Sequence, residues 1–560
     1  MSYYQEIIAL IKEEGPSKER LARAKTDLCK KHGIKEIPTD YEILMHAPDE
    51  DVERIRPFLL SKPQRSISGV APIAIFAKPS KCPHGTCTYC PGGRGSVFGD
   101  VPQAYTGFEP ATRRAIRNLY DPYLQVMNRL EQYFVLGHTP EKVDLIIMGG
   151  TFPAFPPRYK NQFIMEAYKA MNDFSKQFFE NGKLKRNEFI AFFELPHNIH
   201  TDERVTRIHK KLLEMKEQDA KTLEEEQEEN EFAAIRCIGL TIETRPDNAQ
   251  LLHANEMLTW GATRVEVGVQ TTYDDVLERI KRKQTVKDAI DTTKILKNLG
   301  FKINYHMMPG LPGVSREQDL ASLKRIFEDP DFRPDMVKVY PTLVMRGTEL
   351  YDDWKAGKFI PIRAEEAAEM IAEFKKSVPE WVRIMRVQRD IPVDMTEDGV
   401  DKTNLRQLVL EVQKKKGIVC RCIRCRELGR ASNLISTHEL KVQEYDASGG
   451  KEFFLSAEQE DKLIGFCRLR FPDQSLRPEI TLDSAIIREV HVYGEATPLG
   501  KTGAVQHKGI GKELMAKAEE IARNAGKKKV IVISGVGVRE YYRKLGYERE
   551  GPYMVKSLDE

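Results

Sequence analysis

The sequence predicts an α/β protein with a parallel sheet or barrel in its middle, a second α/β or α+β domain at its carboxyl end and a helical segment at its start. Two observations support this prediction. From about residue 71, short apolar runs alternate with amphipathic helical segments, as in parallel α/β folds. From about residue 435, strand-like runs are followed by a glycine-containing loop, a helix and a further strand. A chain of 560 residues is also too long for one ordinary core.

We therefore expect four segments. Residues 1–70 form a helical N-terminal segment, and residues 71–395 form the first α/β domain. Residues 396–434 form a basic linker, and residues 435–560 form the second domain. Within the first domain, apolar runs such as VDLIIMGG and ATRVEVGVQ are the expected strands. Several of them end in glycine, proline or a charged residue, and ligands bind at these strand ends in such folds.

The composition predicts a cytosolic globular protein: 41% of the residues are hydrophobic and 31% are charged. No apolar run reaches the length of a membrane span, and the first fifteen residues are too polar for a signal peptide. Nine cysteines in a chain of this length are not a disulfide framework. In the cytosol, a cysteine cluster more often indicates a metal or catalysis.

The charge is unevenly distributed, although the formal net charge is only +3. Residues 402–430 carry nine Lys/Arg against two acids, and residues 279–302 carry eight against two. These stretches are candidate phosphate-facing patches, and the alternative is two solvated surfaces. The acidic run EEEQEENE at 224–231 ends an insertion that begins near residue 205. We expect a solvated surface helix or a mobile lid there.

Three cysteines lie close together in KCPHGTCTYCPGG, at positions 82, 87 and 90. A structural zinc ion needs a fourth ligand, and His84 is only two residues from Cys82. A four-iron cluster held by three thiolates leaves one iron open for a small molecule. That arrangement resembles radical S-adenosylmethionine (SAM) enzymes, although their usual spacing C-x3-C-x2-C is one residue shorter in the first gap. The spacing of the three cysteines alone does not decide between a zinc ion and an iron–sulfur cluster.

Polar residues at later strand ends favour the iron–sulfur interpretation. Gly149 and Gly150 resemble the radical SAM segment that holds the amino group of the cofactor, although Thr151 stands where an acidic residue is usual. The segment IETRPD places Glu243 and Arg245 at one strand end, and Gln270 ends another. Each could be a buried structural residue, but several in one sheet indicate a shared site. We assign these five residues to SAM.

A second site follows in the carboxyl-terminal domain. The pattern Q-x-x-G-x-G, with Gln506, Gly509 and Gly511, leads directly into an amphipathic helix. Backbone N–H groups at such a helix start bind pyrophosphate, and glycine allows close approach. The order of strands around this loop resembles GNAT acetyltransferases, in which the loop holds coenzyme A. A tyrosine often protonates the leaving thiolate there, and Tyr541 or Tyr542 fits, with packing as the alternative role.

Across residues 70 to the end, the motifs follow the order of one family. CPHGTCTYCPGG, AYTGFEPATRRAIRNLYDP, KVDLIIMGGTFP, IETRPD, MVKVYPTLVMRGTELYDDWKAG, RVQRDIP, REVHVYG, QHKGIG and VISGVGVREYYRKLGYE all match. The chain resembles the catalytic subunit of Elongator, with a compact cysteine spacing similar to the archaeal members. The resemblance implies a radical SAM partial (β/α) barrel followed by a GNAT domain.

The resemblance also implies residue roles. Cys82, Cys87 and Cys90 would hold a 4Fe-4S cluster, and Cys420, Cys422 and Cys425 in C-x-C-x2-C would hold zinc between the domains, with His438 the nearest candidate for a fourth ligand. The acetyl-CoA residues would be Lys142, Glu489, Val490, His491, Val492, Gln506, Gly509, Ile510, Gly511, Lys512 and Tyr542. Lys142, Tyr541 and Tyr542 are the expected catalytic residues. If Lys142 touches the acyl group, the two domains share one reaction chamber.

The implied activity is an acyltransferase that makes carboxymethyluridine at the wobble position of tRNA, with radical SAM chemistry acting on the methyl carbon of acetyl-CoA. The implied RNA partner is a tRNA anticodon stem-loop, which the basic stretches would bind and to which the N-terminal segment could add contacts. An external electron donor is needed, Elongator-like subunits or self-association are possible, and no membrane is involved. The alternatives are a protein lysine acetyltransferase with a structural iron–sulfur domain, and a non-catalytic RNA-binding scaffold.

Overall fold

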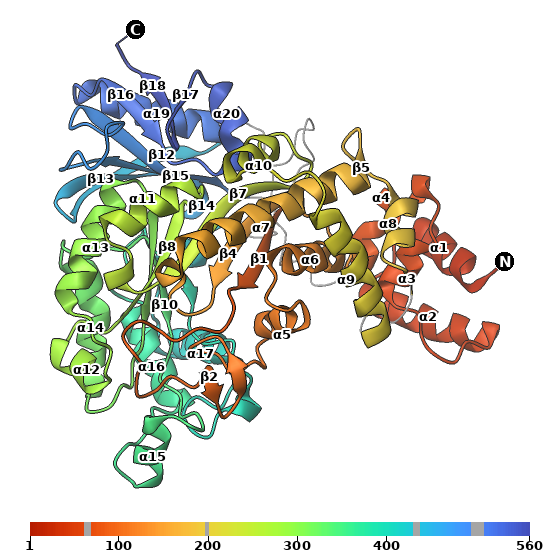
Figure 1. The fold of residues 1–560 in the computed structure, drawn as a ribbon, viewed down its shortest axis with the longest axis horizontal. Coiled ribbons are helices and arrows are strands. Elements are labelled where there is room, and N and C mark those ends of the chain that lie inside the picture. Colours follow the sequence, from red (N-terminus) through yellow and green to blue (C-terminus); the bar gives the residue numbers. More distant parts are fainter. Residues whose placement is uncertain (61–68, 197–200, 429–436, 494–508, 560) are drawn as a thin grey trace.

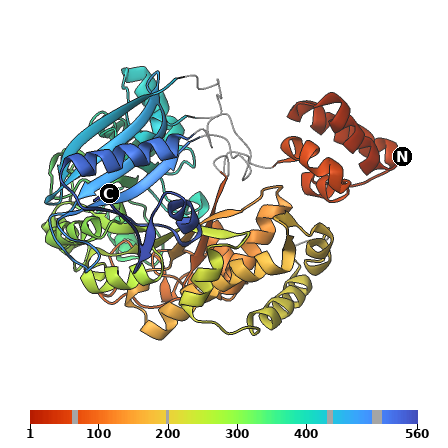
Figure 2. The ribbon, with the colours of Figure 1, turned by 90° about the horizontal axis from the view of Figure 1, so that it is seen from above.

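The computed structural model describes residues 1–60, 69–196, 201–428, 437–493 and 509–559. It contains two large sheets, with the N-terminal helices set to one side of both (Figures 1 and 2). In these ranges, none of the helices is long and apolar enough to cross a membrane.

The first helices form a small unit with its own core. They are α1 (Tyr3–Glu14), α2 (Lys18–His32), α3 (Asp40–Met45) and α4 (Asp49–Leu59). Ser2, Ser17 and Thr39 cap the first three, because each side chain accepts a hydrogen bond from a backbone N–H of the first turn. Apolar residues such as Ile7, Ile43 and Ile55 are buried between these helices. The predicted helical start of the chain is therefore correct.

The central sheet is parallel throughout and contains seven strands in the order β1-β4-β7-β8-β9-β10-β11. They are β1 (Val70–Phe76), β4 (Lys142–Met148), β7 (Arg236–Thr244), β8 (Arg264–Gln270), β9 (Lys302–Met307), β10 (Met336–Val339) and β11 (Arg383–Arg386). Two short hairpins accompany the sheet: β2 (Gly93–Ser96) with β3 (Gly99–Val101), and β5 (Phe179–Glu180) with β6 (Lys183–Leu184). The predicted partial (β/α) barrel is confirmed.

Helices connect and cover these strands, as Figure 1 shows. They are α5 (Pro110–Arg117), α6 (Pro122–Val135), α7 (Pro157–Phe178), α8 (Arg186–Phe192), α9 (Asp202–Lys216), α10 (Leu223–Asn230), α11 (Leu251–Thr259), α12 (Asp274–Arg279), α13 (Val286–Asn298), α14 (Arg316–Glu328), α15 (Glu349–Lys355), α16 (Ala364–Phe374), α17 (Leu405–Lys416) and α18 (Ile423–Arg426). Fully buried apolar residues on one face of the strands, including Ile147, Ile242 and Ile303, form the core beneath the helices. The opposite face lines the interior of the barrel.

The carboxyl-terminal sheet has the order β12-β13-β14-β15-β16-β18-β17. Its elements are β12 (Glu439–Ala447), β13 (Gly450–Gln459), β14 (Lys462–Phe471), β15 (Ser484–Val492), α19 (Ile510–Asn524), β16 (Lys529–Val532), α20 (Arg539–Arg543), β17 (Glu548–Glu550) and β18 (Tyr553–Ser557). Only β15 and β16 pair in parallel, and they do so over four residues, Ser484–Ile487 with Lys529–Val532. Beyond Ile487, β15 continues away from β16, so the sheet opens between these strands.

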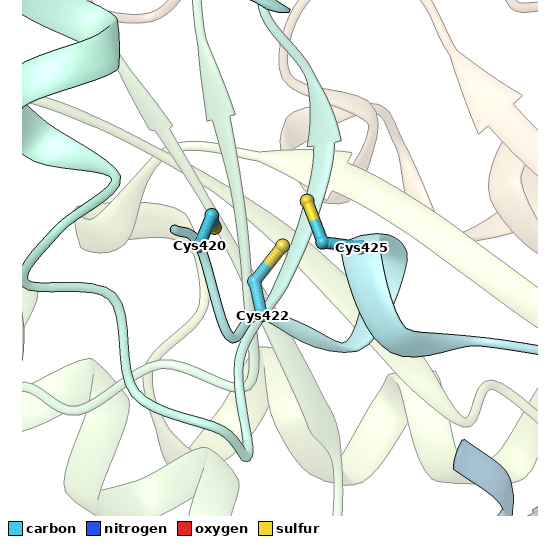
Figure 3. A group of neighbouring side chains, drawn as sticks. All are labelled: Cys420, Cys422 and Cys425. Atoms are coloured by element: carbon cyan, nitrogen blue, oxygen red, sulfur yellow. The ribbon is translucent and has the colours of Figure 1, made fainter. Parts of the chain in front are cut away.

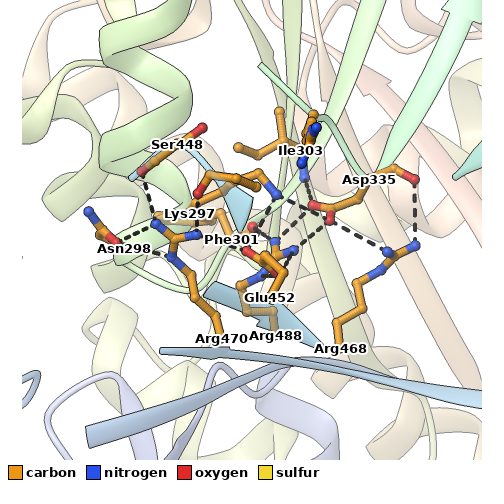
Figure 4. A network of polar contacts seen from close by, with 12 residues as sticks. Lys297, Asn298, Phe301, Ile303, Asp335, Ser448, Glu452, Arg468, Arg470 and Arg488 are labelled. Carbon is orange, nitrogen blue, oxygen red and sulfur yellow. Dashed lines mark hydrogen bonds and ion pairs between the residues drawn. The ribbon is translucent and has the colours of Figure 1, made fainter. Parts of the chain in front are cut away.

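Buried charges join the two sheets. Arg488 of β15 donates to both carboxylate oxygens of Asp335, at 2.5 and 2.8 Å, and to Glu452 at 2.8 Å (Figure 4). Lys297 of α13 lies 3.4 Å from Glu452 and 3.7 Å from Asp335. All four side chains are fully buried. Because a buried charge is costly unless paired, this network fixes how the two domains meet.

Two expectations about charged segments hold only in part. The acidic run does form a surface helix, α10, on which Glu224 and Glu228 are exposed. It is not a free lid, because Glu231 is buried and pairs with Arg539 at 2.8 Å and Arg543 at 2.6 Å, both in α20. The basic stretch 279–302 is not simply a phosphate-facing surface, because Lys297 lies in the buried network and Arg282 points toward a cysteine. In both cases tertiary pairing, which composition does not reveal, decides where the charge lies.

Candidate active sites at two ends of one barrel

A cavity of about 580 Å³ lies where the central strands end. Cys82, Cys87 and Cys90, in the loop after β1, all line it. Among the described residues, two other groups of three Cys, His or Glu side chains have ligand atoms that all lie within 4.8 Å of one another. The sulfurs of Cys82, Cys87 and Cys90 do not meet this criterion, so at least one pair of them lies farther apart. A single zinc ion with bonds of about 2.3 Å would draw its ligands closer than that. The wider spacing fits a multi-iron cluster better than a zinc ion.

Hydrogen-bond donors surround these sulfurs. Gln103 Nε2 donates to Cys90 Sγ at 3.3 Å, and an Arg282 nitrogen donates to Cys87 Sγ at 3.6 Å. His84 Nε2 lies 3.2 Å from Cys87 Sγ, so it contacts a cysteine rather than standing apart as a fourth ligand. Burial raises the pKa of the Cys90 thiol to about 12, and iron binding would displace that proton. These donors suit thiolates that carry part of the negative charge of a cluster.

The strand-end residues assigned to SAM gather at the same cavity. Gly150, Glu243, Arg245 and Gln270 line it, and Gly149 precedes Gly150 in the turn after β4. A side chain at Gly149 would meet the backbone of Ala77 at 3.1 Å, and its φ of +116° also favours glycine. Gln270 has a φ of +72°, and its buried Oε1 has no hydrogen-bond partner in the described part of the chain. An unpartnered buried acceptor at a cavity wall fits a bound polar cofactor.

Two of these side chains, Arg245 and Glu243, already form hydrogen bonds or ion pairs within the protein. Arg245 donates to both carboxylate oxygens of Asp247 at 2.9 Å and to the backbone oxygen of Arg282 at 2.8 Å. Glu243 accepts a hydrogen bond from the Tyr105 hydroxyl at 3.1 Å and lies 3.5 Å from Lys338. Arg245 and Glu243 therefore both shape the cavity wall, and Glu243 also belongs to a charged cluster that lines the cavity.

That cluster contains Glu243, Glu266 and His306, whose ligand atoms converge within 4.8 Å. His306 Nε2 lies 2.9 Å from Glu266, and the Lys338 ammonium forms an ion pair with the same carboxylate. Lys338 holds the pKa of Glu266 well below its usual range against the opposing effect of burial. The lysine supplies the positive charge that a metal ion would otherwise bring.

Lys142 lies at the opposite end of the barrel from the cysteines. It begins β4, whereas Gly149 and Gly150 follow the end of the same strand. Its register partner Arg236 packs against Gly537 in the carboxyl-terminal domain, two residues before α20. Burial lowers the pKa of Lys142. One strand of about 20 Å therefore carries both a predicted acetyl-CoA residue and two predicted SAM residues, at its two ends.

The predicted acetyl-CoA residues lie along the opening of the second sheet. Glu489, Val490, His491 and Val492 follow the point where β15 leaves β16. Glu489 accepts from Arg468 at 2.9 Å, and the His491 ring stacks on Phe466. Gly509 caps α19 with a φ of +90°, and Ile510, Gly511 and Lys512 form its first turn. Gln506 lies outside the described residues.

The two tyrosines are placed differently, although their rings lie 5.2 Å apart. The Tyr541 hydroxyl lies 3.1 Å from where a Cβ of Gly511 would be, so it reaches the start of α19. Tyr542 is buried in the core of this domain beside Tyr547. Burial raises the pKa of both phenols, which keeps them protonated and able to donate.

The cysteines of C-x-C-x2-C form a second compact group of ligand-type side chains among the described residues. The sulfurs of Cys420, Cys422 and Cys425 lie within 4.8 Å of one another, as Figure 3 shows. Such a group suits one tetrahedral ion with a fourth ligand from outside. His438 is not that ligand, because its Nε2 is 2.7 Å from Glu513 of α19. That suggestion from sequence order is wrong, since the following strand carries His438 elsewhere.

Sequence reasoning missed several cavity residues, including Gln103, Tyr105, Arg282, His306 and Lys338. The signal for His306 and Lys338 was available, since both stand on apolar strands where a charged residue is unexpected. Gln103, Tyr105 and Arg282 come from loops. Only the folded chain shows that Gln103 and Arg282 point at the cysteines and that Tyr105 points at Glu243.

Family models match most of the chain. They are the ELP3 N-terminal domain at residues 1–67, the radical SAM superfamily at 79–326, the radical SAM C-terminal domain at 334–415 and the GNAT acetyltransferase family at 424–547. The radical SAM match implies a 4Fe-4S cluster and SAM, and the GNAT match implies acetyl-CoA. The donor sets described above fit these groups.

Named relatives cover nearly the whole length. The chain is 46% identical to the tRNA uridine(34) acetyltransferase of Methanocaldococcus jannaschii, over 97% of this chain and 94% of that protein. It is 40% identical to human Elongator complex protein 3, over 96% and 93% respectively. The solved structure of archaeal Methanocaldococcus infernus Elp3 with an N-terminal deletion is 41% identical, with a TM-score of 0.70, over 88% of this chain and all of that one. The chain belongs to the Elongator complex protein 3 family.

Proposed function

We propose that this protein is a tRNA uridine(34) acetyltransferase that joins the methyl carbon of acetyl-CoA to C5 of the wobble uridine. Hydrolysis of the thioester by water would then release coenzyme A and leave a carboxymethyl group. The observation that carries this proposal is the placement of two candidate sites at opposite ends of one half barrel. The named relatives at 40% and 46% identity support it. The cluster with SAM would supply a radical able to take hydrogen from an unactivated methyl group.

The residues of this chain bind and orient the reactants. Cys82, Cys87 and Cys90 would hold the cluster, with Gln103 and Arg282 donating to its thiolates. The turn at Gly149 and Gly150, the wall at Glu243 and Arg245, and the free Oε1 of Gln270 would hold SAM. A base splayed from a single-stranded anticodon loop can enter such a cavity.

On the acetyl-CoA side, the N-terminus of α19 would bind the pyrophosphate through Ile510, Gly511 and Lys512. The open half of β15, from Glu489 to Val492, would offer the pantetheine arm backbone groups on its β16 side, where no strand in the described part of the chain pairs with it. Tyr541 reaches this helix start and stays protonated, so it is placed to donate to the departing thiolate. Lys142, on the barrel end that faces this domain, would contact the acyl group.

We assign zinc to Cys420, Cys422 and Cys425, supported by their convergence within 4.8 Å. The test is metal analysis of the purified protein beside a variant with all three changed to serine. We expect the loss of about one zinc per chain. An unchanged zinc content in that variant would refute the assignment.

The function is tested under anaerobic conditions. The purified chain is reconstituted with iron and sulfide, then given reductant, SAM, acetyl-CoA and unmodified tRNA. Digested RNA is examined by mass spectrometry for carboxymethyluridine. We expect product from the wild type and none from Cys87→Ala, whose loss removes one cluster ligand. Lysine acetylation of a protein substrate without any modified uridine would instead favour a protein acetyltransferase.

A further inference from the structure

The interior face of the barrel is apolar on β1 and β4, where Ala74, Ile146 and Met148 line the cavity, and polar on β7, β8, β9 and β10. Glu243, Glu266, His306 and Lys338 face the cavity. Because side chains on a strand alternate between faces, the same interior face carries Thr241, Arg264, Lys302 and Asn304. A parallel barrel is ordinarily filled there with branched apolar side chains. This interior needs a different explanation from packing.

One ion pair lies at each end of the polar interior. On the side of the carboxyl-terminal domain, Arg264 reaches across β7 to Asp144 of β4 at 2.9 Å. Gly239 leaves room for this pair, since a Cβ there would lie 3.3 Å from Asp144. On the cavity side, Lys338 pairs with Glu266. The cavity extends to the level of the Asp144 pair, because it is lined by Pro72, the register partner of Asp144. The interior between the two pairs is therefore a compartment with a charged group at each end.

The compartment contains buried polar atoms that form no hydrogen bond with any described residue. Neither amide atom of Asn304 has a hydrogen-bond partner among the described residues, and the same holds for the Thr241 hydroxyl. Both side chains are completely buried. A buried polar group without a partner lowers stability, so leucine or valine would stabilise the fold better at these positions. An amide donor, an amide acceptor and a hydroxyl together suit a carboxylate or a thioester carbonyl.

The compartment also adjoins the proposed acetyl-CoA strand. Arg468 donates to Glu489 of β15 at 2.9 Å and lies 3.6 Å from Asp335. The Asp335 carboxylate accepts a hydrogen bond at 2.9 Å from the backbone N–H of Ile303, the residue before Asn304. Arg264 lies 3.7 Å from Glu266 as well as 2.9 Å from Asp144. Its guanidinium can therefore release Asp144 without becoming unpaired, which would open the compartment at that end.

We propose that this compartment is a passage that binds a two-carbon acyl group between the acetyl-CoA strand and the cysteine-lined cavity. The proposal rests on the proposed function, because it presumes that the acetyl group is delivered at one end and used at the other. Asn304 and Thr241 bind the oxygen atoms of the group, and Arg264 controls its entry. The group travels either on the thioester arm or as free acetate, and both present the same carbonyl chemistry.

The test uses Asn304→Leu and Thr241→Val, which keep side-chain volume and remove the unused polar atoms. Thr241→Ser restores the hydroxyl, and Ile303→Val is the matched control on the outer face of β9. In the reconstituted enzyme, we expect both main variants to bind acetyl-CoA and to cleave SAM within about twofold of wild type. Carboxymethyluridine should fall at least tenfold and recover in Thr241→Ser.

Thermal unfolding separates this role from a structural one. Removing an unpartnered polar group should leave the melting temperature unchanged or raised. A lower melting temperature with loss of both half-reactions would make these residues structural and overturn the passage. Unchanged product in Asn304→Leu would also overturn it, because the compartment would then hold only water. If wild type makes no product, the proposed function fails first.

Isotope dilution identifies the form in which the group moves. Acetyl-CoA labelled with ¹³C in its acetyl group is supplied together with an excess of unlabelled acetate. If the ¹³C content of the carboxymethyl group falls when acetate is added, the group passes as free acetate. If the ¹³C content is unchanged, the group passes on the thioester arm.

Discussion

At the residue scale, hydrogen bonds to the cysteine sulfurs set the properties of the proposed cluster. Gln103 Nε2 donates to Cys90 at 3.3 Å and also to the backbone oxygen of Gly92 at 3.1 Å, which fixes its position. Gln103 is buried, and its amide points at the sulfur rather than at solvent. Donors of this kind stabilise the reduced, more negative state of an iron–sulfur cluster.

Gln103→Leu should therefore make the cluster harder to reduce. We expect its reduction potential to fall by tens of millivolts, since one donor to a sulfur is lost. A redox titration followed by electron paramagnetic resonance measures this in the reconstituted enzyme. Gln162→Leu, an exposed position on α7, is the control. An unchanged potential in Gln103→Leu would show that the amide does not act on the cluster.

His491 should make stability depend on pH. Burial lowers the pKa of this imidazole to about 4 from its ordinary value of about 6.5. Between these values the unfolded chain binds the proton more readily, so the free energy of unfolding rises as pH increases from 4 to 6.5. His491→Phe keeps the ring that stacks on Phe466 and should flatten this part of the profile. Chemical denaturation at several pH values measures the difference, and parallel profiles would contradict the assignment.

At the element scale, the acidic insertion joins the barrel domain to the helix that carries both tyrosines. Glu231, which caps α10, is 2% exposed and pairs with Arg539 and Arg543 of α20. Arg549 adds outer contacts to Glu224 at 3.4 Å and Glu228 at 3.3 Å. The insertion therefore holds α20, and with it Tyr541, against the barrel.

Glu231→Gln should loosen this contact. Removing the charge leaves two arginines without their buried partner, which costs about 3–5 kcal/mol of stability in comparable pairs. Glu228→Gln is a matched control, because its exposed pair is worth at most about 1 kcal/mol. Limited proteolysis and thermal unfolding measure both variants. Equal behaviour of the two would mean that the buried pair does not hold α20 in place.

At the scale of the whole molecule, the charged network between the sheets makes the two domains one unit. Asp335 follows α14 in the barrel domain, whereas Glu452 and Arg488 belong to β13 and β15. Figure 4 shows how these side chains interleave at the contact. This rigid contact keeps β15 beside the barrel end where Lys142 lies, which a shared reaction requires.

Asp335→Ala should uncouple the domains. Arg488 and Lys297 would be left buried with less compensating charge, at a cost of about 3–5 kcal/mol. We expect calorimetry to show one unfolding transition in wild type and two in the variant. Lys294→Gln removes a half-exposed pair with Asp473 at 2.6 Å, near the same contact, and should keep one transition. A single transition in Asp335→Ala at the wild-type temperature would contradict the coupling.

The sequence by itself determined the local patterns of this protein. Apolar runs and helical periodicity predicted most strands of both sheets, and glycines at 149, 150 and 509 marked turns that backbone geometry requires. The spacing of Cys82, Cys87 and Cys90 predicted a metal loop, because ligands close in sequence must lie close in space. These features depend on neighbours along the chain, and a sequence displays its neighbours directly.

Only the tertiary structure decided how distant parts meet. It placed Lys142 at the other end of β4 from the cysteines, turned Arg282 toward Cys87 and buried Lys297 and Glu231 in contacts between domains. It also brought Thr241, Arg264 and Asn304 from three strands into one polar interior. Charge counts along the chain cannot show this, because whether a charge meets water or a partner depends on packing between segments hundreds of residues apart.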